Sequence, residues 1–194
     1  MKIVGITGGI ASGKSIVSSY LQDNYKAYIF DADKEAKALL QLSLVKAKIH
    51  KAFPNLKDLS KTSIAQEVFK NSKSQEKINN IIHPIISDLI LERINEKKDL
   101  HNIFVIDAAL IIESGLFEQN QKIGAKLILI IADEELRLKR ALHRADLDQE
   151  TIKDRMRLQM NDDEKIKYSD YVIENNSSEL DLYSKIDQII KKII

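Results

Sequence analysis

The stretch Gly8-Gly9-Ile10-Ala11-Ser12-Gly13-Lys14-Ser15 follows a short apolar run at residues 2–6 and opens an amphipathic helical pattern. It matches G-x-x-x-x-G-K-[ST], in which glycines let successive backbone N–H groups turn inward around phosphate oxygens. In this pattern the lysine reaches the β and γ phosphates of a nucleotide, and the serine hydroxyl is a ligand for Mg²⁺. The sequence therefore predicts a phosphate-binding loop; the alternative is a glycine-rich turn that holds no ligand.

Short apolar runs rich in Ile, Val, Leu and Phe alternate with helical periodicity along much of the chain, which predicts an α/β fold with a parallel sheet. The runs hardly alternate with polar residues, as expected for strands that helices cover on both faces. The five expected strands are residues 2–6, 27–30, 103–106, 127–130 and, with a weaker pattern, 171–173.

Residues 34–98 contain no convincing strand and are expected to form a helical insertion. Apolar residues between Ile78 and Ile94 recur at the i, i+3, i+4, i+7 spacing of an amphipathic helix. Pro84 lies inside this stripe and lacks the backbone N–H that a helix interior needs, so we expect a kink or a break next to His83. Further helices are expected at residues 34–40, 133–144 and 180–190, whereas the highly charged residues 144–168 are expected to be mobile and solvated.

Composition limits the classes of protein that fit. The 194 residues favour one domain, and 30 Lys and Arg against 29 Asp and Glu give a net charge of +1, so overall charge does not favour nucleic acid or an anionic membrane as a partner. The absence of cysteine excludes disulfides and thiolate metal sites, and it fits a reducing compartment such as the cytoplasm. We expect neither a signal peptide nor a membrane-spanning helix, since no apolar segment approaches the ~20 residues that spanning requires.

Acidic residues follow two of the expected strands. Because ligands bind beyond the carboxyl ends of strands in open α/β sheets, Asp31, Asp33 and Asp107 are expected on the same rim as the phosphate-binding loop. Asp33 is our candidate for the base that takes a proton from an attacking hydroxyl, although either Asp31 or Asp33 can instead cap the following helix. Asp107 ends an apolar run as a metal-holding acid does, or is simply a polar strand end.

Three arginines, Arg137, Arg140 and Arg144, share one side of the helix expected at residues 133–144. Their guanidinium groups can neutralise charge on a phosphoryl group in transfer, and Arg140 is the preferred candidate. The alternative is a solvated basic face paired with nearby acids. The four histidines show no metal-ligand spacing, and no serine lies in a nucleophile elbow, so a hydrolase triad is not indicated.

Taken together, these motifs resemble the dephospho-CoA kinase family, whose members transfer a phosphoryl group from ATP to the ribose 3′-hydroxyl of dephospho-CoA in the last step of coenzyme A synthesis. The resemblance runs from end to end of the chain, in the family's order. The matching residues are 6–15, Asp31 to Asp33, His83-Pro84, Asp107 with 110–113, 138–140, Arg144, Gln159 and 172–176.

This resemblance implies a P-loop NTPase-type three-layer fold in one domain. The nucleotide-binding core would comprise residues 1–33, 99–137 and 169–194, with a CoA-binding helical insertion at 34–98 and a lid at 138–168 that closes over ATP. The implied substrates are ATP and dephospho-CoA, with Mg²⁺ as cofactor, in a monomer or small homo-oligomer.

The resemblance also assigns site residues. The implied catalytic residues are Asp33, Lys14 and Arg140. The implied ATP-binding residues are Gly9, Ile10, Ala11, Ser12, Gly13, Lys14, Ser15, Ile16, Arg144, Asn175 and Asn176, with one of the two asparagines near adenine. The implied acceptor-binding residues are Thr7, Asp31, Asp33, His83, Leu110 and Glu113, and the implied metal ligands are Ser15 and Asp107, the latter directly or through water.

Two positions depart from the family's usual pattern. Ile16 stands where a threonine is usual, which removes a hydroxyl near the α phosphate, and Ala109 stands where a proline is usual, which leaves that part of the acceptor wall freer in φ. Two rival functions remain open: another small-molecule kinase acting on a nucleoside monophosphate or a sugar-like alcohol, and an ATP-dependent switch whose helical insertion binds a protein.

Overall fold

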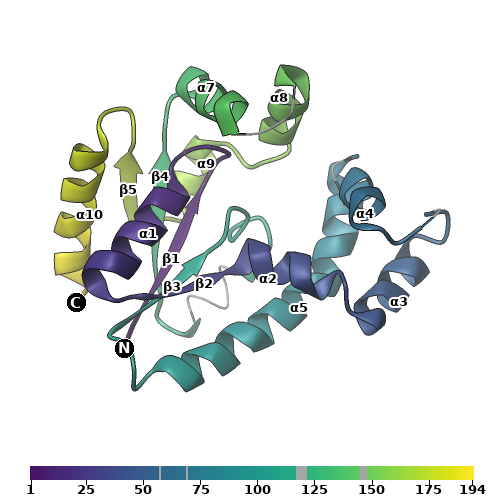
Figure 1. Cartoon of the computed structure of the whole chain (residues 1–194), viewed down its shortest axis with the longest axis horizontal. Helices are drawn as coiled ribbons and strands as arrows, with labels where there is room; N and C mark the ends of the chain where they lie inside the picture. The colour runs from purple at the N-terminus through teal and green to yellow at the C-terminus, as the bar shows by residue number, and fades with distance from the viewer. Residues whose placement is uncertain (57, 69, 117–121, 145–147) are drawn as a thin grey trace.

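The fold centres on a five-stranded, all-parallel sheet in the order β2-β3-β1-β4-β5 (Figure 1). This computed structural model describes residues 1–56, 58–68, 70–116, 122–144 and 148–194. The strands are β1 Lys2–Gly8, β2 Tyr28–Asp31, β3 Ile103–Asp107, β4 Lys126–Ile131 and β5 Tyr171–Glu174. The predicted α/β class with a parallel sheet is confirmed, and each expected strand is present within one or two residues of its predicted bounds.

Helices cover both faces of the sheet, which gives three layers. The described helices are α1 Lys14–Tyr25, α2 Ala32–Leu39, α3 Ser43–Ala52, α4 Lys61–Val68, α5 Ser72–Lys97, α7 Glu134–Arg144, α8 Gln149–Arg157, α9 Asp162–Ile166 and α10 Glu179–Ile193. Alternate residues of β3 belong to two separate buried clusters, Ile103 and Val105 to one and Phe104 and Ile106 to the other. A strand with apolar residues on both faces needs this double cover, because successive side chains point to opposite sides.

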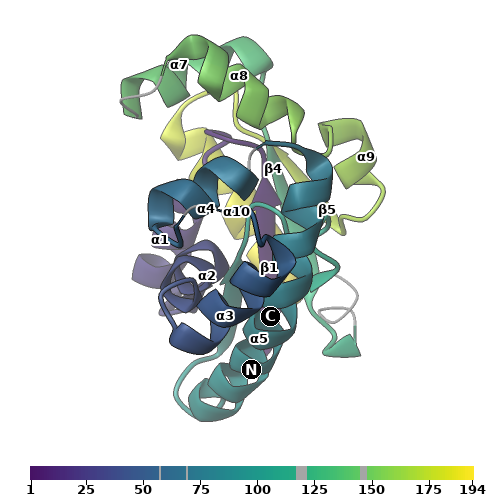
Figure 2. The same cartoon turned by 90° about the vertical axis from the view of Figure 1, so that its right-hand side faces the viewer.

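The two buried clusters are covered by different helices. Helices α1 and α10 supply one cluster, and α2 to α5 supply the other, so α1 and α10 lie on the opposite side of the sheet from α5 (Figure 1). Helices α3 and α4 extend away from the sheet, while α7 and α8 lie beyond the carboxyl end of β1 in both views (Figures 1 and 2). Helices α7 and α8 therefore lie at the end of the sheet where the phosphate-binding loop follows β1.

Helix α5 is continuous through Pro84, so the predicted alternative of a break at this position is wrong. Ile78 and Ile82 before the proline and Ile86 and Ile90 after it are all buried on one stripe. Burial of a large aliphatic side chain contributes ~1.5–3 kcal/mol, so the stripe outweighs one lost backbone hydrogen bond and the local clash.

The charged segment after α7 is more ordered than its composition predicts. It forms α8 and α9, and it buries Ile152 at 2% exposure and the charged Lys165 at 0%. The expectation of a fully solvated piece is therefore wrong for these two residues, and residues 145–147 lie outside the described part. Within the described residues, no helix has the length and apolar character needed to cross a membrane.

Candidate active site

The phosphate-binding loop connects β1 to α1 and is supported from behind by β5. Gly13 has a left-handed φ of 110°, and a Cβ there would lie 2.2 Å from Nδ2 of Asn175. That Nδ2 donates a hydrogen bond of 2.8 Å to the carbonyl of Ser12, and Asn175 is only 3% exposed. The amide of Asn175 therefore holds the loop in place; a position near adenine remains a prediction.

Lys14 enters α1 with its ammonium directed at the carboxyl end of β3. Its Nζ donates to Oδ1 of Asp107 at 2.7 Å, while the buried Ser18 hydroxyl donates to Oδ2 of the same carboxylate at 2.6 Å. Lys14 retains 14% side-chain exposure and Ser15 is exposed in the first turn of α1. The loop, the cation and the β3 acid that the sequence separates by 93 positions thus form one polar cluster.

The two aspartates after β2 have different surroundings. Asp31 is exposed and its Oδ1 accepts the Lys34 N–H at 2.8 Å, so it caps α2, the alternative that the sequence left open. Asp33 is half-buried in the first turn of α2 and accepts a long hydrogen bond of 3.4 Å from the Ala109 N–H. Burial raises the pKa of Asp33 above its ordinary value, and the Lys14 ammonium partly opposes that rise. A carboxylate with a raised pKa is a stronger base.

Asp33 lines a cavity of about 460 Å³ between α2, α4, α5 and the segment after β3. Most of the wall consists of Ile, Leu, Val and Ala side chains, and His83 and Leu110, two of the predicted acceptor contacts, also line it. Burial lowers the pKa of His83 to about 4, although a backbone hydrogen bond with Ser114 opposes this shift. His83 therefore faces the cavity as a neutral imidazole near pH 7.

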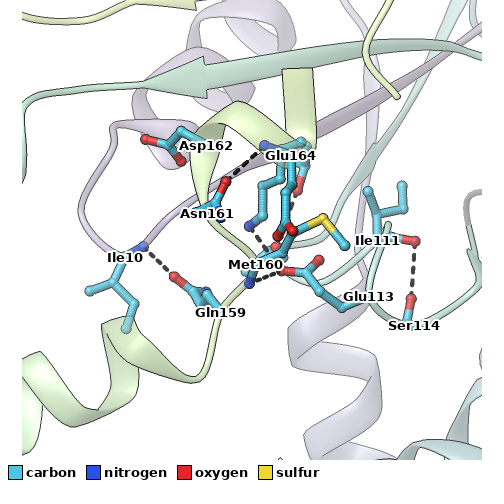
Figure 3. Close-up of polar contacts among 12 residues, drawn as sticks. Ile10, Ile111, Glu113, Ser114, Gln159, Met160, Asn161, Asp162 and Glu164 are labelled. Atoms are coloured by element: carbon cyan, nitrogen blue, oxygen red, sulfur yellow. Dashed lines mark hydrogen bonds and ion pairs between the residues drawn. The ribbon is translucent and has the colours of Figure 1, made fainter. Parts of the chain in front are cut away.

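Two predicted acceptor contacts are engaged elsewhere. Thr7 is 0% exposed, and its hydroxyl donates to the Ala109 carbonyl at 3.1 Å, so it supports the cavity wall from beneath. Glu113 accepts the Met160 N–H at 3.1 Å and pairs with Nζ of Lys165 at 3.0 Å, which ties the wall to α9 (Figure 3). Neither residue is among those that line the cavity.

The structure places Arg137 and Gln159 beside the loop. A Cβ on Gly9 would lie 1.9 Å from Nη1 of Arg137, so the guanidinium group lies directly against the loop. Arg137 is 14% exposed, and its Nη2 lies 3.9 Å from Oδ2 of Asp162. Gln159 accepts the Ile10 N–H at 2.9 Å. The shared arginine face of α7 was a signal for Arg137, whereas no local pattern marks the role of Gln159.

The other predicted ATP contacts differ in what their side chains already bind. Arg140 is half-buried, and its Nη1 is buried with no hydrogen-bond partner among the residues that the structure describes, so it has a donor available there. The Asn176 carboxamide is paired with Asp133: its Oδ1 accepts the Asp133 N–H and its Nδ2 donates to the Asp133 carboxylate, both at 2.9 Å. The side chain of Arg144 lies outside the described residues. Among the described contacts, the α7 arginine that lies against the loop is therefore Arg137.

The oxygen atoms near Lys14 suit Mg²⁺. This ion prefers oxygen ligands, keeps several waters and takes only one or two protein groups beside nucleotide phosphates. Ser15 offers an exposed hydroxyl, and both oxygens of Asp107 are already held by Lys14 and Ser18, which fits a contact through water. No cluster of three or more His, Asp or Glu suited to a metal occurs in the part of the chain that the structure describes.

Comparison with known proteins gives a consistent result. The family model described as dephospho-CoA kinase matches residues 2–181. The chain is 35% identical over 197 residues to a dephospho-CoA kinase of Fusobacterium nucleatum, covering 98% of each chain. It is 33% identical to a dephospho-CoA kinase of Saccharomyces cerevisiae, covering all of this chain and 83% of the relative. A solved dephospho-CoA kinase from Campylobacter jejuni superimposes with a TM-score of 0.66 at 30% identity, covering 100% of this chain and 98% of that one.

Proposed function

Because the chain belongs to the dephospho-CoA kinase family, we propose that its phosphate-binding loop holds ATP and that the cavity beside Asp33 holds dephospho-CoA. The protein phosphorylates dephospho-CoA with ATP in coenzyme A biosynthesis. The observation that carries the proposed placement is that Asp33 lines the cavity while the Lys14 ammonium acts to lower the pKa of its carboxyl group. The carboxylate therefore lies between the acceptor cavity and the group that contacts the phosphates.

The proposed reaction is a direct transfer. The ribose 3′-hydroxyl oxygen of dephospho-CoA forms a bond to the γ phosphorus of ATP, the bond from that phosphorus to the β,γ-bridging oxygen breaks, and ADP leaves. Asp33 takes the hydroxyl proton on a carboxylate oxygen. Burial supports this role, since it raises the pKa of Asp33 and so strengthens the base.

Positioning and charge supply the rest of the catalysis. In this proposal, Lys14 and Arg140 contact the phosphoryl group during its transfer. ATP is surrounded by residues 9–16, Arg144, Asn175 and Asn176. Ser15 and, through water, Asp107 would hold Mg²⁺, and the bound ion would neutralise phosphate charge. The cation of Lys14 and the unused donor of Arg140 are suited to the charge that spreads over the transferred group.

The proposed acceptor site comprises Asp33, His83 and Leu110, with Asp31, Thr7 and Glu113 supporting its wall. A largely apolar cavity suits the uncharged arm and base of dephospho-CoA, and the neutral imidazole of His83 adds a hydrogen-bonding group without a charge. In this assignment residues 34–98 bind the acceptor and residues 138–168 close as a lid over residues 1–33, 99–137 and 169–194.

We further propose a cytoplasmic protein that acts on small molecules, with neither nucleic acid nor a membrane as partner, as a monomer or small homo-oligomer. The near-zero net charge and the absence of cysteine in the sequence support this assignment.

The test is ADP release with ATP and Mg²⁺ in the presence of dephospho-CoA, with the product identified as CoA. Parallel reactions contain nucleoside monophosphates, or no acceptor. We expect ADP and CoA to form in equal amounts, with little ADP in the absence of acceptor. ADP formed only with another acceptor would favour a different small-molecule kinase, and equal ADP without any acceptor would favour an ATP-dependent switch.

A further inference from the structure

Gln159 lies where the phosphate-binding loop meets the acceptor cavity. It follows α8, and its Oε1 accepts the Ile10 N–H at 2.9 Å across 149 positions of sequence (Figure 3). Ile10 and Gln159 both line the same cavity as Asp33. The carboxamide therefore borders the space that a phosphoryl group crosses on its way from the loop to an acceptor held beside Asp33.

The backbone N–H of Ile10 also fixes the orientation of this carboxamide. A backbone N–H only donates, so the atom of Gln159 that meets it is the oxygen, and the amide nitrogen with its two N–H donors points elsewhere. Within the described residues, no hydrogen bond is recorded for this Nε2. Gln159 thus combines an anchored acceptor with a free donor at the cavity.

The neighbouring residue is anchored independently. Met160 donates its N–H to Oε1 of Glu113 at 3.1 Å (Figure 3). The same oxygen lies 3.0 Å from Nζ of Lys165. Lys165 is 0% exposed and Glu113 retains 16% side-chain exposure. An ion pair this buried holds a narrow range of geometries, because either partner alone would leave an uncompensated charge in the interior. The chain that carries Gln159 is therefore placed before any substrate arrives.

We propose that Gln159 is a further catalytic residue, which docks through Oε1 on the Ile10 N–H and donates through Nε2 to an oxygen of the phosphoryl group in transfer. This inference rests on the proposed positions of ATP and the acceptor. A preorganised donor directed at developing charge stabilises the transition state more than the ground state. The role differs from simple support of the loop, since only the donor atom touches the reacting group.

Two substitutions separate the donor from the anchor. Gln159→Glu keeps the length of the side chain and an oxygen that accepts from Ile10, but when ionised it has no donor. Gln159→Met keeps the length and removes both polar atoms. Gln149→Met is the matched control, because Gln149 is an exposed glutamine at the start of α8 in the same segment. Thermal unfolding of each variant is measured alongside kcat and both KM values.

We expect kcat to fall at least about tenfold in Gln159→Met and about a hundredfold in Gln159→Glu at pH 8, with the KM for ATP changed less than kcat in the methionine variant. Because a protonated glutamic acid has one donor and one acceptor, like glutamine, the activity of Gln159→Glu relative to the unsubstituted protein is expected to rise several-fold between pH 8 and pH 5.5. Gln149→Met is expected to match the unsubstituted protein.

Each remaining outcome would overturn the donor role. Full activity of the glutamate variant at pH 8 with loss in the methionine variant would show an anchoring role only. Loss in the glutamate variant alone would show charge repulsion. Tighter ATP binding with unchanged kcat in the methionine variant would show that Gln159 merely occupies a phosphate position. Failure of the proposed function would instead appear in the unsubstituted protein, as no acceptor-dependent ADP.

Discussion

The phosphate-binding loop and the cavity proposed to hold the acceptor lie side by side, but the side chains around them differ in polarity. Around the loop, several polar groups are already paired: Lys14 with Asp107, and the Asn175 amide with the Ser12 carbonyl. Around the cavity the wall is mostly aliphatic, with a neutral His83 and the half-buried Asp33 among its polar groups. The difference indicates that the loop contributes charge and preorganisation, whereas the cavity contributes shape and a low dielectric that tunes Asp33.

This contrast has a kinetic consequence. Substitutions at the loop are expected to change ATP affinity and rate together, and substitutions in the cavity wall are expected to change the KM for the acceptor alone. Asp33, which belongs to both regions, is expected to change the rate without changing the affinity for ATP. Five predictions test this division.

The largest effect is expected for Asp33→Asn. The amide cannot take the proton from the attacking hydroxyl of dephospho-CoA, so kcat is expected to fall about 10²- to 10⁴-fold. The affinity for ATP is expected to stay within a few-fold of that of the unsubstituted protein. Asp88→Asn, an exposed position on α5, is the matched control. Calorimetry with ATP measures the affinity, and single-turnover kinetics measures the rate of phosphoryl transfer. Near-normal turnover in Asp33→Asn would contradict the assignment of Asp33 as the base.

The same carboxylate predicts the acid side of the pH profile. Burial raises the pKa of Asp33, and a base acts only when it is deprotonated. The value of kcat/KM is therefore expected to fall with decreasing pH at a higher pH than an ordinary aspartate, about 3.9, would give. The Asn variant is expected to lack this limb. An unchanged limb in the variant would assign the titration to another group.

Lys14→Ala is expected to have the next largest effect, on both quantities at once. Loss of the ammonium removes a contact to the phosphates and also frees one oxygen of Asp107, so ATP affinity and kcat are each expected to fall, kcat by about a hundredfold or more. Lys191→Ala, at an exposed site on α10, is the control. Retention of both affinity and rate would contradict the assignment of this loop to phosphate.

The cavity side is tested by filling it. Ala36 lines the cavity from α2, and Ala36→Leu adds three carbon atoms to that wall, so the KM for dephospho-CoA is expected to rise about tenfold with the KM for ATP unchanged. Ala47→Leu on the exposed side of α3 controls for the substitution itself. An equal rise in both KM values would mean that the two regions are not separate in function.

The same contrast explains what the sequence predicted. The phosphate-binding loop is a local pattern, since eight consecutive residues determine both its backbone and its ligand, and the strands follow from short apolar runs. Asp107 and Asp33 were also predictable, because parallel strands end at one rim of the sheet. These features depend on neighbours in sequence or on a general rule of the fold.

The contacts made by residues after α7 were not predictable in this way. Gln159 meets Ile10 across 149 positions, and Lys165 is buried against Glu113 in a segment whose charge indicated solvent. Only the packing of α8 and α9 against the rim creates these pairs, and no periodicity encodes that packing. Glu113 was accordingly predicted as an acceptor contact, whereas the structure pairs it with Lys165 of α9.

The smallest expected effect concerns His83 and the claim that the cavity wall carries no imidazolium. Burial lowers the pKa of His83 to about 4 from 6.5, so the folded state binds fewer protons at this site than the unfolded state between those two values. The stability contributed by the neutral ring is therefore present above pH 6.5 and lost as the pH falls toward 4. Denaturant unfolding at pH 7.5 and pH 5 is expected to show a smaller pH difference for His83→Asn than for the unsubstituted protein. NMR titration is expected to find the ring neutral at pH 5.5, and a midpoint near 6.5 would contradict the assignment of a buried, neutral imidazole to this cavity wall.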